Sequence, residues 1–330
     1  MNTNFTNNIS EIRDKISENS REIGLVVDEG ADLPQEIIEK YQMAVVPIKM
    51  DWPDLENLPG KNTFQKMREV EKRGIKSFGK TSQPSPKDFL DAFKKQLEKF
   101  DKILCLALTS KLSGTYNSAI QAKDLLEPEQ KDYNPPTASS HSSLGSEWAP
   151  RIFVVDTLNI TCGEALLVLK AIDLINEGKE VEEIIKELEK LIPRVRLYGM
   201  LEEIKWLEAS GRISHTLANW VRRMQKIGFR PIIGIKKGVI KAIGIKAGAK
   251  DIPTALFHQF EAKTKQFRNR GKKIRVAITH GDNFEGAQRL KELIEKNLKN
   301  TEVVFINLID NVLGVLVGPD TLILAWCEIT

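Results

Sequence analysis

The sequence is poor in cysteine, in net charge and in long apolar runs. Only three cysteines occur among the 330 residues, far apart and each inside an apolar run: Cys105, Cys162 and Cys327. This number and spacing exclude a disulfide framework and a cysteine-based metal site, and they favour a reducing, cytoplasmic location. The formal net charge of +4 is small for a chain of this length, so nucleic acid is not expected as a partner.

Two further absences concern membranes and export. No stretch of about 18 uncharged apolar residues occurs, so no membrane-spanning helix is expected. Residues 1–22 are polar and contain acids, and they lack the apolar centre of a secretory signal. We therefore expect this segment to be a polar N-terminal tail.

Apolar runs and helical patterns alternate along the first half of the chain. Strands are expected at 23–27, 43–50, 103–108 and 152–155, and helices at 33–40, 63–73, 87–100 and 116–126. This alternation predicts an α/β fold, with a parallel sheet flanked by helices. Residues 127–150 interrupt the pattern with four prolines and a serine-rich centre, which is typical of an insertion loop.

The second half of the chain has a different arrangement of expected elements. A helix is expected at 285–297, and strands at 195–198, 274–279, 303–308 and in a hairpin over 232–245 that turns at Lys237-Gly238. These elements indicate a second α/β domain with a mixed or antiparallel sheet. We place the N-terminal α/β domain at residues 23–165 and the C-terminal one at 166–330.

Two hydroxyl-rich segments are the most informative local feature. One is Thr81-Ser82-Gln83-Pro84-Ser85, and the other includes Ser113-Gly114-Thr115 between an expected strand and an expected helix. Backbone N–H groups at a helix start, together with hydroxyls, suit a carboxylate or a phosphate. A plain capped helix start remains the alternative for each segment, with Ser85 as N-cap and Pro86 as the first helical residue.

Other motifs of anion chemistry are missing. No GxxxxGK[ST] loop occurs, so the sequence does not predict a nucleotide-binding P-loop. No GxSxG turn occurs either, so Ser113 is not predicted to be an acyl-transfer nucleophile. No catalytic residue, metal site or cofactor site is predicted.

A basic amphipathic helix is expected at 216–227, after the turn Ser210-Gly211-Arg212. Basic residues beside a tryptophan suit a membrane surface or a partner protein. The candidates for such contact are Arg212, Trp220, Arg222 and Arg223. The alternative is a surface helix that packs on its own domain.

Taken together, the motifs resemble the DegV family, which includes the fatty-acid-binding subunits of bacterial fatty acid kinase. The resemblance spans about residues 23–325. It rests on Asp28 with Ala31-Asp-Leu-Pro34, on Val45-Val-Pro-Ile48, on the segments at 81–85 and 113–116, and on 154–157, 210–213, 230–233 and Gly318-Pro319.

The resemblance implies two α/β domains that enclose one long-chain fatty acid in an apolar tunnel. It places the carboxylate at Thr81 and Ser113, with Ser82, Gly114 and Thr115 around them. It also implies a binding protein, not an enzyme, that presents the acid to a separate kinase. The basic helix, with its charge beside an apolar stripe, adds the expectation of transient contact with a membrane surface. Candidates for the tunnel wall are Ile204, Leu207, Leu217, Met224 and Ile232.

The sequence departs from the family pattern near the expected head group. A His-Thr pair that the family carries late in the chain is Leu316-Val317 here, and Glu29-Gly30 replace hydroxyl residues of the opening motif. Two other functions stay open: an enzyme that acts on a small phosphorylated or carboxylated metabolite at the same anion site, and a binding module that has lost its ligand.

Overall fold

The computed structural model describes residues 23–131, 151–247 and 251–329. The predicted tail at 1–22 lies outside these residues, as does most of the predicted insertion at 127–150. The beginning of that insertion is helical, because the helix α6 (Thr115–Lys131) continues beyond its predicted end at residue 126.

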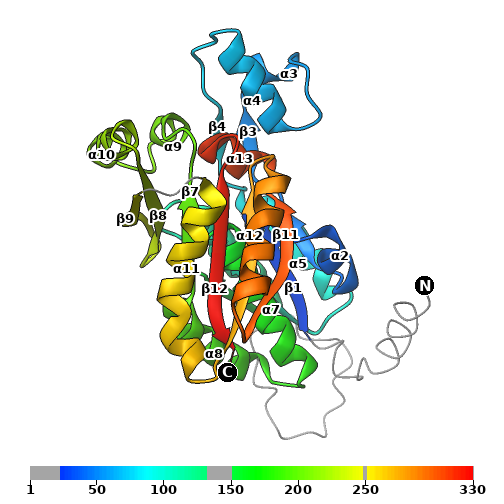
Figure 1. The fold of residues 1–330 in the computed structure, drawn as a ribbon. Coiled ribbons are helices and arrows are strands. Elements are labelled where there is room, and N and C mark those ends of the chain that lie inside the picture. Colours follow the sequence, from blue (N-terminus) through cyan, green and yellow to red (C-terminus); the bar gives the residue numbers. More distant parts are fainter. Residues whose placement is uncertain (1–22, 132–150, 248–250, 330) are drawn as a thin grey trace, which may run out of the picture.

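Sheet A has four parallel strands in the order β2-β1-β5-β6, of which Figure 1 labels β1. They are β2 (Ala44–Val46), β1 (Ile23–Asp28), β5 (Lys102–Ala107) and β6 (Ile152–Asp156). Every residue of β1 is buried, as expected for a parallel strand covered on both faces. This confirms the predicted parallel sheet.

Alternate residues of β1 belong to two different cores. Val26 packs with Phe89 and Phe93 of α5 (Pro86–Leu97), on the face that α5 and α6 cover. Leu25 and Val27 pack on the opposite face, where α7 (Thr161–Asn176) lies. The predicted cap of α5 is present, since Ser85 and Asp88 bond each other's backbone N–H and Pro86 opens the helix.

Sheet C has six strands in the order β11-β10-β12-β7-β8-β9. Only β10 and β11 pair in parallel, so the sheet is mixed, as predicted. The strands are β7 (Arg196–Met200), β8 (Phe229–Lys236), β9 (Val239–Ala247), β10 (Lys273–His280), β11 (Thr301–Leu308) and β12 (Leu322–Ile329). The helices α11 (Ile252–Asn269) and α12 (Phe284–Asn297) cover one face.

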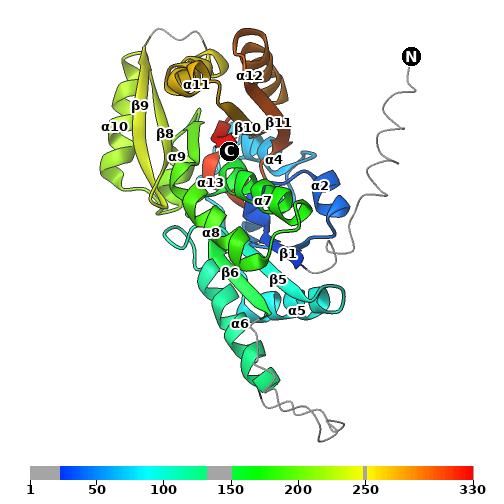
Figure 2. The ribbon, with the colours of Figure 1, turned by 90° about the horizontal axis from the view of Figure 1, so that it is seen from below.

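Helix α7 connects the two halves. It contacts β5 of sheet A and β7, β10 and β12 of sheet C, and Figure 2 shows it between the sheets. The helix is almost entirely buried in its first half. The division at 165/166 falls inside this helix, which belongs to the core of both sheets; that division stays a prediction.

The predicted strand at 43–50 is wrong in detail. It is split into β2 and β3 (Lys49–Asp51), with Pro47 between them, because proline cannot donate to a strand ladder. Strand β3 pairs antiparallel with β4 (Lys80–Ser82), in register Met50 to Thr81. Thr81 and Ser82 therefore lie in a short strand, not in a turn.

Between β3 and β4 the chain forms α3 (Pro53–Glu56) and α4 (Thr63–Lys72), and α4 packs against α13 (Asn311–Val317). Short elements complete the fold: η2 (Glu29–Ala31), α2 (Gln35–Lys40), α8 (Val181–Leu191), η3 (Ile192–Arg194), α9 (Lys205–Ala209) and α10 (His215–Lys226). Helix α10 confirms the predicted basic helix.

Candidate functional site

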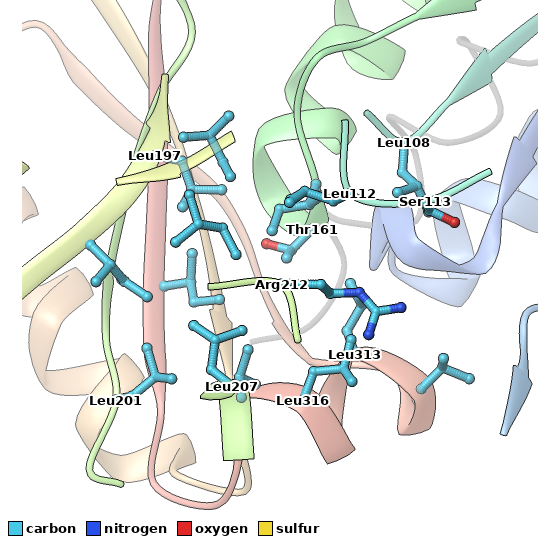
Figure 3. A pocket seen from close by; sticks show the side chains of 18 of the residues that line it. Leu108, Leu112, Ser113, Thr161, Leu197, Leu201, Leu207, Arg212, Leu313 and Leu316 are labelled. Carbon is cyan, nitrogen blue, oxygen red and sulfur yellow. The ribbon is translucent and has the colours of Figure 1, made fainter. Parts of the chain in front are cut away.

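A cavity opens between the carboxyl edge of sheet A and one face of sheet C (Figure 3). The empty space within it, including its open mouth, is about 780 Å³. Its wall is apolar apart from Thr81, Ser113, Thr161 and Arg212. The remaining lining residues are Ile48, Leu108, Leu112, Ile160, Leu197, Gly199, Leu201, Leu207, Ile233, Gly234, Ile235, Ile240, Val312, Leu313, Leu316, Val317 and Ile323.

The two hydroxyl segments meet at this cavity, and Gln83 joins them. Its Nε2 donates to Ser118 Oγ on α6 at 3.2 Å, and its side chain packs against Gly114 so closely that a Cβ there would lie 1.8 Å from Gln83 Oε1. Gln83 thus holds β4, which contains Thr81, against the start of α6, which Ser113 precedes. The sequence analysis missed this role, although Gln83 lies between the two serines of its own segment.

Of the five predicted head-group residues, Thr81 and Ser113 line the cavity. Ser113 Oγ lies 2.8 Å from Thr115 Oγ1 and accepts a bond from Thr115 N–H, so buried Thr115 supports Ser113 from behind. Gly114 provides the close contact to Gln83. Ser82 is exposed and is not part of the wall.

Arg212 reaches into the same end of the cavity. Its Nη2 donates to Thr81 Oγ1 at 2.8 Å, and Figure 3 shows its guanidinium near Leu313. Within the described residues no carboxylate pairs with it, and burial lowers the pKa of its guanidinium. Arg212 was predicted to contact a partner or a membrane; the structure places it where an anion in the cavity would be its counter-charge.

The other predicted contact residues lie on α10, away from the cavity wall. Trp220 is half-buried against the core. Arg222 pairs with Glu208 and bonds to Asn219, whereas Arg223 is exposed. In the described part of the chain, no helix is both long and apolar enough to cross a membrane.

Leu316 and Val317, which replace the polar pair of the family pattern, both line the cavity. They add apolar surface where a donor was expected. Of the five residues proposed for a tunnel wall, only Leu207 lines the cavity. Ile204 and Ile232 are buried in the core instead.

A layer of buried acids lies behind the wall. Asp28 accepts bonds from the backbone N–H groups of Gly30 and Leu108, and burial raises its pKa to about 7. Burial also raises the pKa of Asp310 to about 6 and, together with the nearby charge of Asp310, raises that of Asp32 well above its usual value. Glu164 is fully buried and its pKa is raised in the same way.

These acids do not face the cavity, and the described residues contain no group of three or more His, Cys, Asp or Glu arranged for a metal ion. The lining contains no His, Cys, Asp, Glu or Lys at all. The site can therefore bind an anion at one end and an apolar body along the rest of its length.

Comparison with known proteins identifies the family of this chain. The sequence model of the family described as "Uncharacterised protein, DegV family" matches residues 22–328. The chain belongs to the DegV family. A DegV domain-containing protein of Clostridium acetobutylicum is 35% identical over 224 residues, which cover 66% of this chain and 69% of the relative.

Two DegV relatives are described by what they bind. A protein of Thermotoga maritima named "Fatty acid-binding protein" is 28% identical and covers 91% of this chain and 95% of its own. A solved structure described as fatty acid binding of a DegV family protein from Thermus thermophilus has a TM-score of 0.73 at 26% identity. It covers 93% of this chain and 100% of that one.

Proposed function

We propose that this protein binds one long-chain fatty acid in the cavity, with the carboxylate at Arg212, Thr81 and Ser113. The observation that carries the proposal is an apolar cavity that ends on a half-buried arginine without a carboxylate partner among the described residues. The descriptions of the DegV relatives from Thermotoga maritima and Thermus thermophilus support it. No metal or cofactor besides the fatty acid is required.

The two ends of such a ligand would have different tasks. About fourteen methylenes at about 0.8 kcal/mol each offer up to about 11 kcal/mol before the costs of ordering. The carboxylate loses its water on entry and needs hydrogen bonds in return, which the arginine and the two hydroxyls can donate. The chain would give the affinity, and the head group would fix the direction.

The lining argues against the alternative of an enzyme for a small polar metabolite. Such an enzyme needs a base that converges on its substrate, and the lining within the described residues offers none. The same lining supports a lipid ligand, because three of its four polar side chains (Thr81, Ser113 and Arg212) lie at one end.

The direct test is native mass spectrometry of protein from lipid-replete cells, followed by solvent extraction. Delipidated protein is then titrated with palmitic acid. We expect one acyl chain per protein and saturable binding that weakens strongly in Thr81→Ala/Ser113→Ala. Absence of both an acyl chain and saturable binding would contradict the proposal.

We further propose that the protein presents the bound carboxylate to a separate fatty acid kinase in the cytoplasm, for phospholipid synthesis. Thr81 and Ser113 are only half-buried, which supports access of a partner to the head group. The three cysteines are free thiols, as this location requires. Acyl phosphate formation by a kinase should depend on this protein and should be lost in the same double variant.

Transient contact of α10 with a membrane surface belongs to the same proposal. Arg223 and Lys226 are exposed, and Ile227 is 63% exposed beside them. Changing Arg223 and Lys226 to Glu should lower binding to anionic vesicles, while the control Lys296→Glu/Lys299→Glu on and after α12 should not. Equal binding by both variants would remove the membrane from the proposal.

A further inference from the structure

A second, smaller cavity lies at the other end of α7 and β12. It is open to solvent, and the empty space within it, including its open mouth, is about 350 Å³. Thr161 and Ile323 line the first cavity, whereas Lys170 on α7 and Cys327 on β12 line the second. The nine-residue step from Thr161 to Lys170 along α7 and the four-residue step from Ile323 to Cys327 along β12 each span about 13 Å. The two cavities are therefore separate. Residues of α8 and of the end of β12 line the second cavity, and Figure 1 shows these elements far from α13 and β4.

The wall of this cavity carries three cations from three elements. Lys170 comes from α7, Arg194 from η3 and Arg275 from β10. Arg275 Nε is buried and has no hydrogen-bond partner. No ion pair engages Lys170 or Arg194 within the described residues, and Arg194 uses its Nε on Lys190 O, which leaves its Nη groups available.

The acids of the wall already have partners. Asp173 pairs with Arg275 at 2.6 Å, Glu187 with Lys190 at 2.7 Å and Glu328 with Lys272 at 3.0 Å. Lys190 and Lys272 are not part of the wall. The wall itself holds three cations and three acids. When Lys190 and Lys272 are counted as the partners of Glu187 and Glu328, the cations exceed the acids by two, although Lys170 and Arg194, after Lys190, also lower the pKa of Glu187.

We propose that this cavity binds a small phosphate-class oxyanion, held by Arg275, Arg194 and Lys170. Guanidinium groups suit such ligands because they donate two parallel hydrogen bonds, and the lysine adds a point charge.

The pKa of the Cys327 thiol reflects the charges around this cavity. Arg275, Lys170 and Arg194 each lower its pKa and Asp173 raises it, but burial outweighs the cations and raises the pKa of the thiol to about 11. The thiol is therefore neutral at physiological pH. No thiolate competes with an incoming anion for the three cations.

The test is calorimetric titration of the full-length protein with inorganic phosphate, with glycerol 3-phosphate and with acetate, all at constant ionic strength. We expect saturable 1:1 binding of a phosphate compound. Binding should weaken at least tenfold in Lys170→Gln/Arg194→Gln and stay unchanged in the charge-matched control Lys186→Gln/Lys299→Gln. The first two titrants distinguish free phosphate from a monoester. Equal binding in the two variants, equal binding of acetate, or no binding to the wild-type protein would overturn the proposal.

A second measurement does not depend on the variants. Phosphate added to ¹⁵N-labelled wild-type protein should shift the amide resonances of Arg194, Cys327 and Glu328. Shifts confined to Ser113 and Arg212 would assign the anion to the first cavity and overturn the second site. Because this site shares no lining residue with the fatty acid cavity, its failure and that of the proposed function are distinguishable.

Discussion

Gly114 offers a sharp test of how the head-group end is built. A Cβ at this position would lie 1.8 Å from Gln83 Oε1 and 2.4 Å from its Cδ. The backbone of Gly114 is not in the left-handed region, so alanine is tolerated by the chain itself. Gly114→Ala must therefore act by displacing the Gln83 side chain, which loses its hydrogen bond to Ser118.

The expected effects on stability and on binding differ in size. Loss of one half-buried hydrogen bond costs about 1 kcal/mol, and replacing glycine by alanine returns about 0.5 to 1 kcal/mol through the unfolded state. The free energy of unfolding should change by less than about 1 kcal/mol. Binding should suffer more, because a displaced Thr81 loses a charge-assisted hydrogen bond of about 1.5 to 3 kcal/mol, or about 10- to 150-fold in Kd.

The assay is displacement of a fluorescent fatty acid by palmitate, together with urea unfolding. The control is the double-mutant cycle with Gln83→Ala, which removes the clashing group. Gly114→Ala should weaken binding strongly in the wild-type background and little in the Gln83→Ala background. Equal losses in both backgrounds would refute the clash as the cause, and no loss in either would refute the role of Gln83 in positioning Thr81.

Three other predictions follow from named contacts. Arg212→Gln should weaken fatty acid binding about 10- to 100-fold by calorimetry but leave the binding of the matching fatty alcohol within about twofold. Gly199→Val should favour shorter acids in extracted lipid, because a Cβ there lies 3.5 and 3.6 Å from cavity residues Ile233 and Ile323. Between about pH 4 and pH 7 the folded protein keeps the Asp28 proton that the unfolded chain has released, because the folded pKa is raised from 3.8 to about 7. The contribution of Asp28 to the free energy of unfolding should therefore fall by up to about 4 kcal/mol as pH rises through that window. Urea unfolding should show this fall as a decreasing difference in the free energy of unfolding between the wild-type protein and Asp28→Asn.

Features with a local cause could be predicted from the sequence. The buried parallel strands follow from short apolar runs, and the start of α5 follows from Ser85, Pro86 and Asp88 acting within one turn. The hairpin of β8 and β9 turns at Lys237-Gly238, where both residues have positive φ. Each of these signals is contained in a few neighbouring residues.

Features that depend on distant partners were missed. The segment at 43–50 has one apolar pattern, yet Pro47 divides it, and β3 pairs with β4 about thirty residues later, which no local pattern indicates. The inward direction of Arg212 is set by Thr81, which lies 131 residues away. A basic residue beside a basic helix favours a surface role by composition, and only the fold reveals that it faces a cavity.

The consequence of Leu316 for head-group binding depends on the position of Arg212. A histidine there would give the head group a donor whose charge depends on pH. Leu316 gives none, whereas Arg212 keeps its charge across the physiological range despite partial burial. In the proposed function, the carboxylate would therefore rely on one permanent cation and two hydroxyls. The protein's affinity for a fatty acid should consequently follow the ionisation of the ligand and not that of a side chain in the cavity wall.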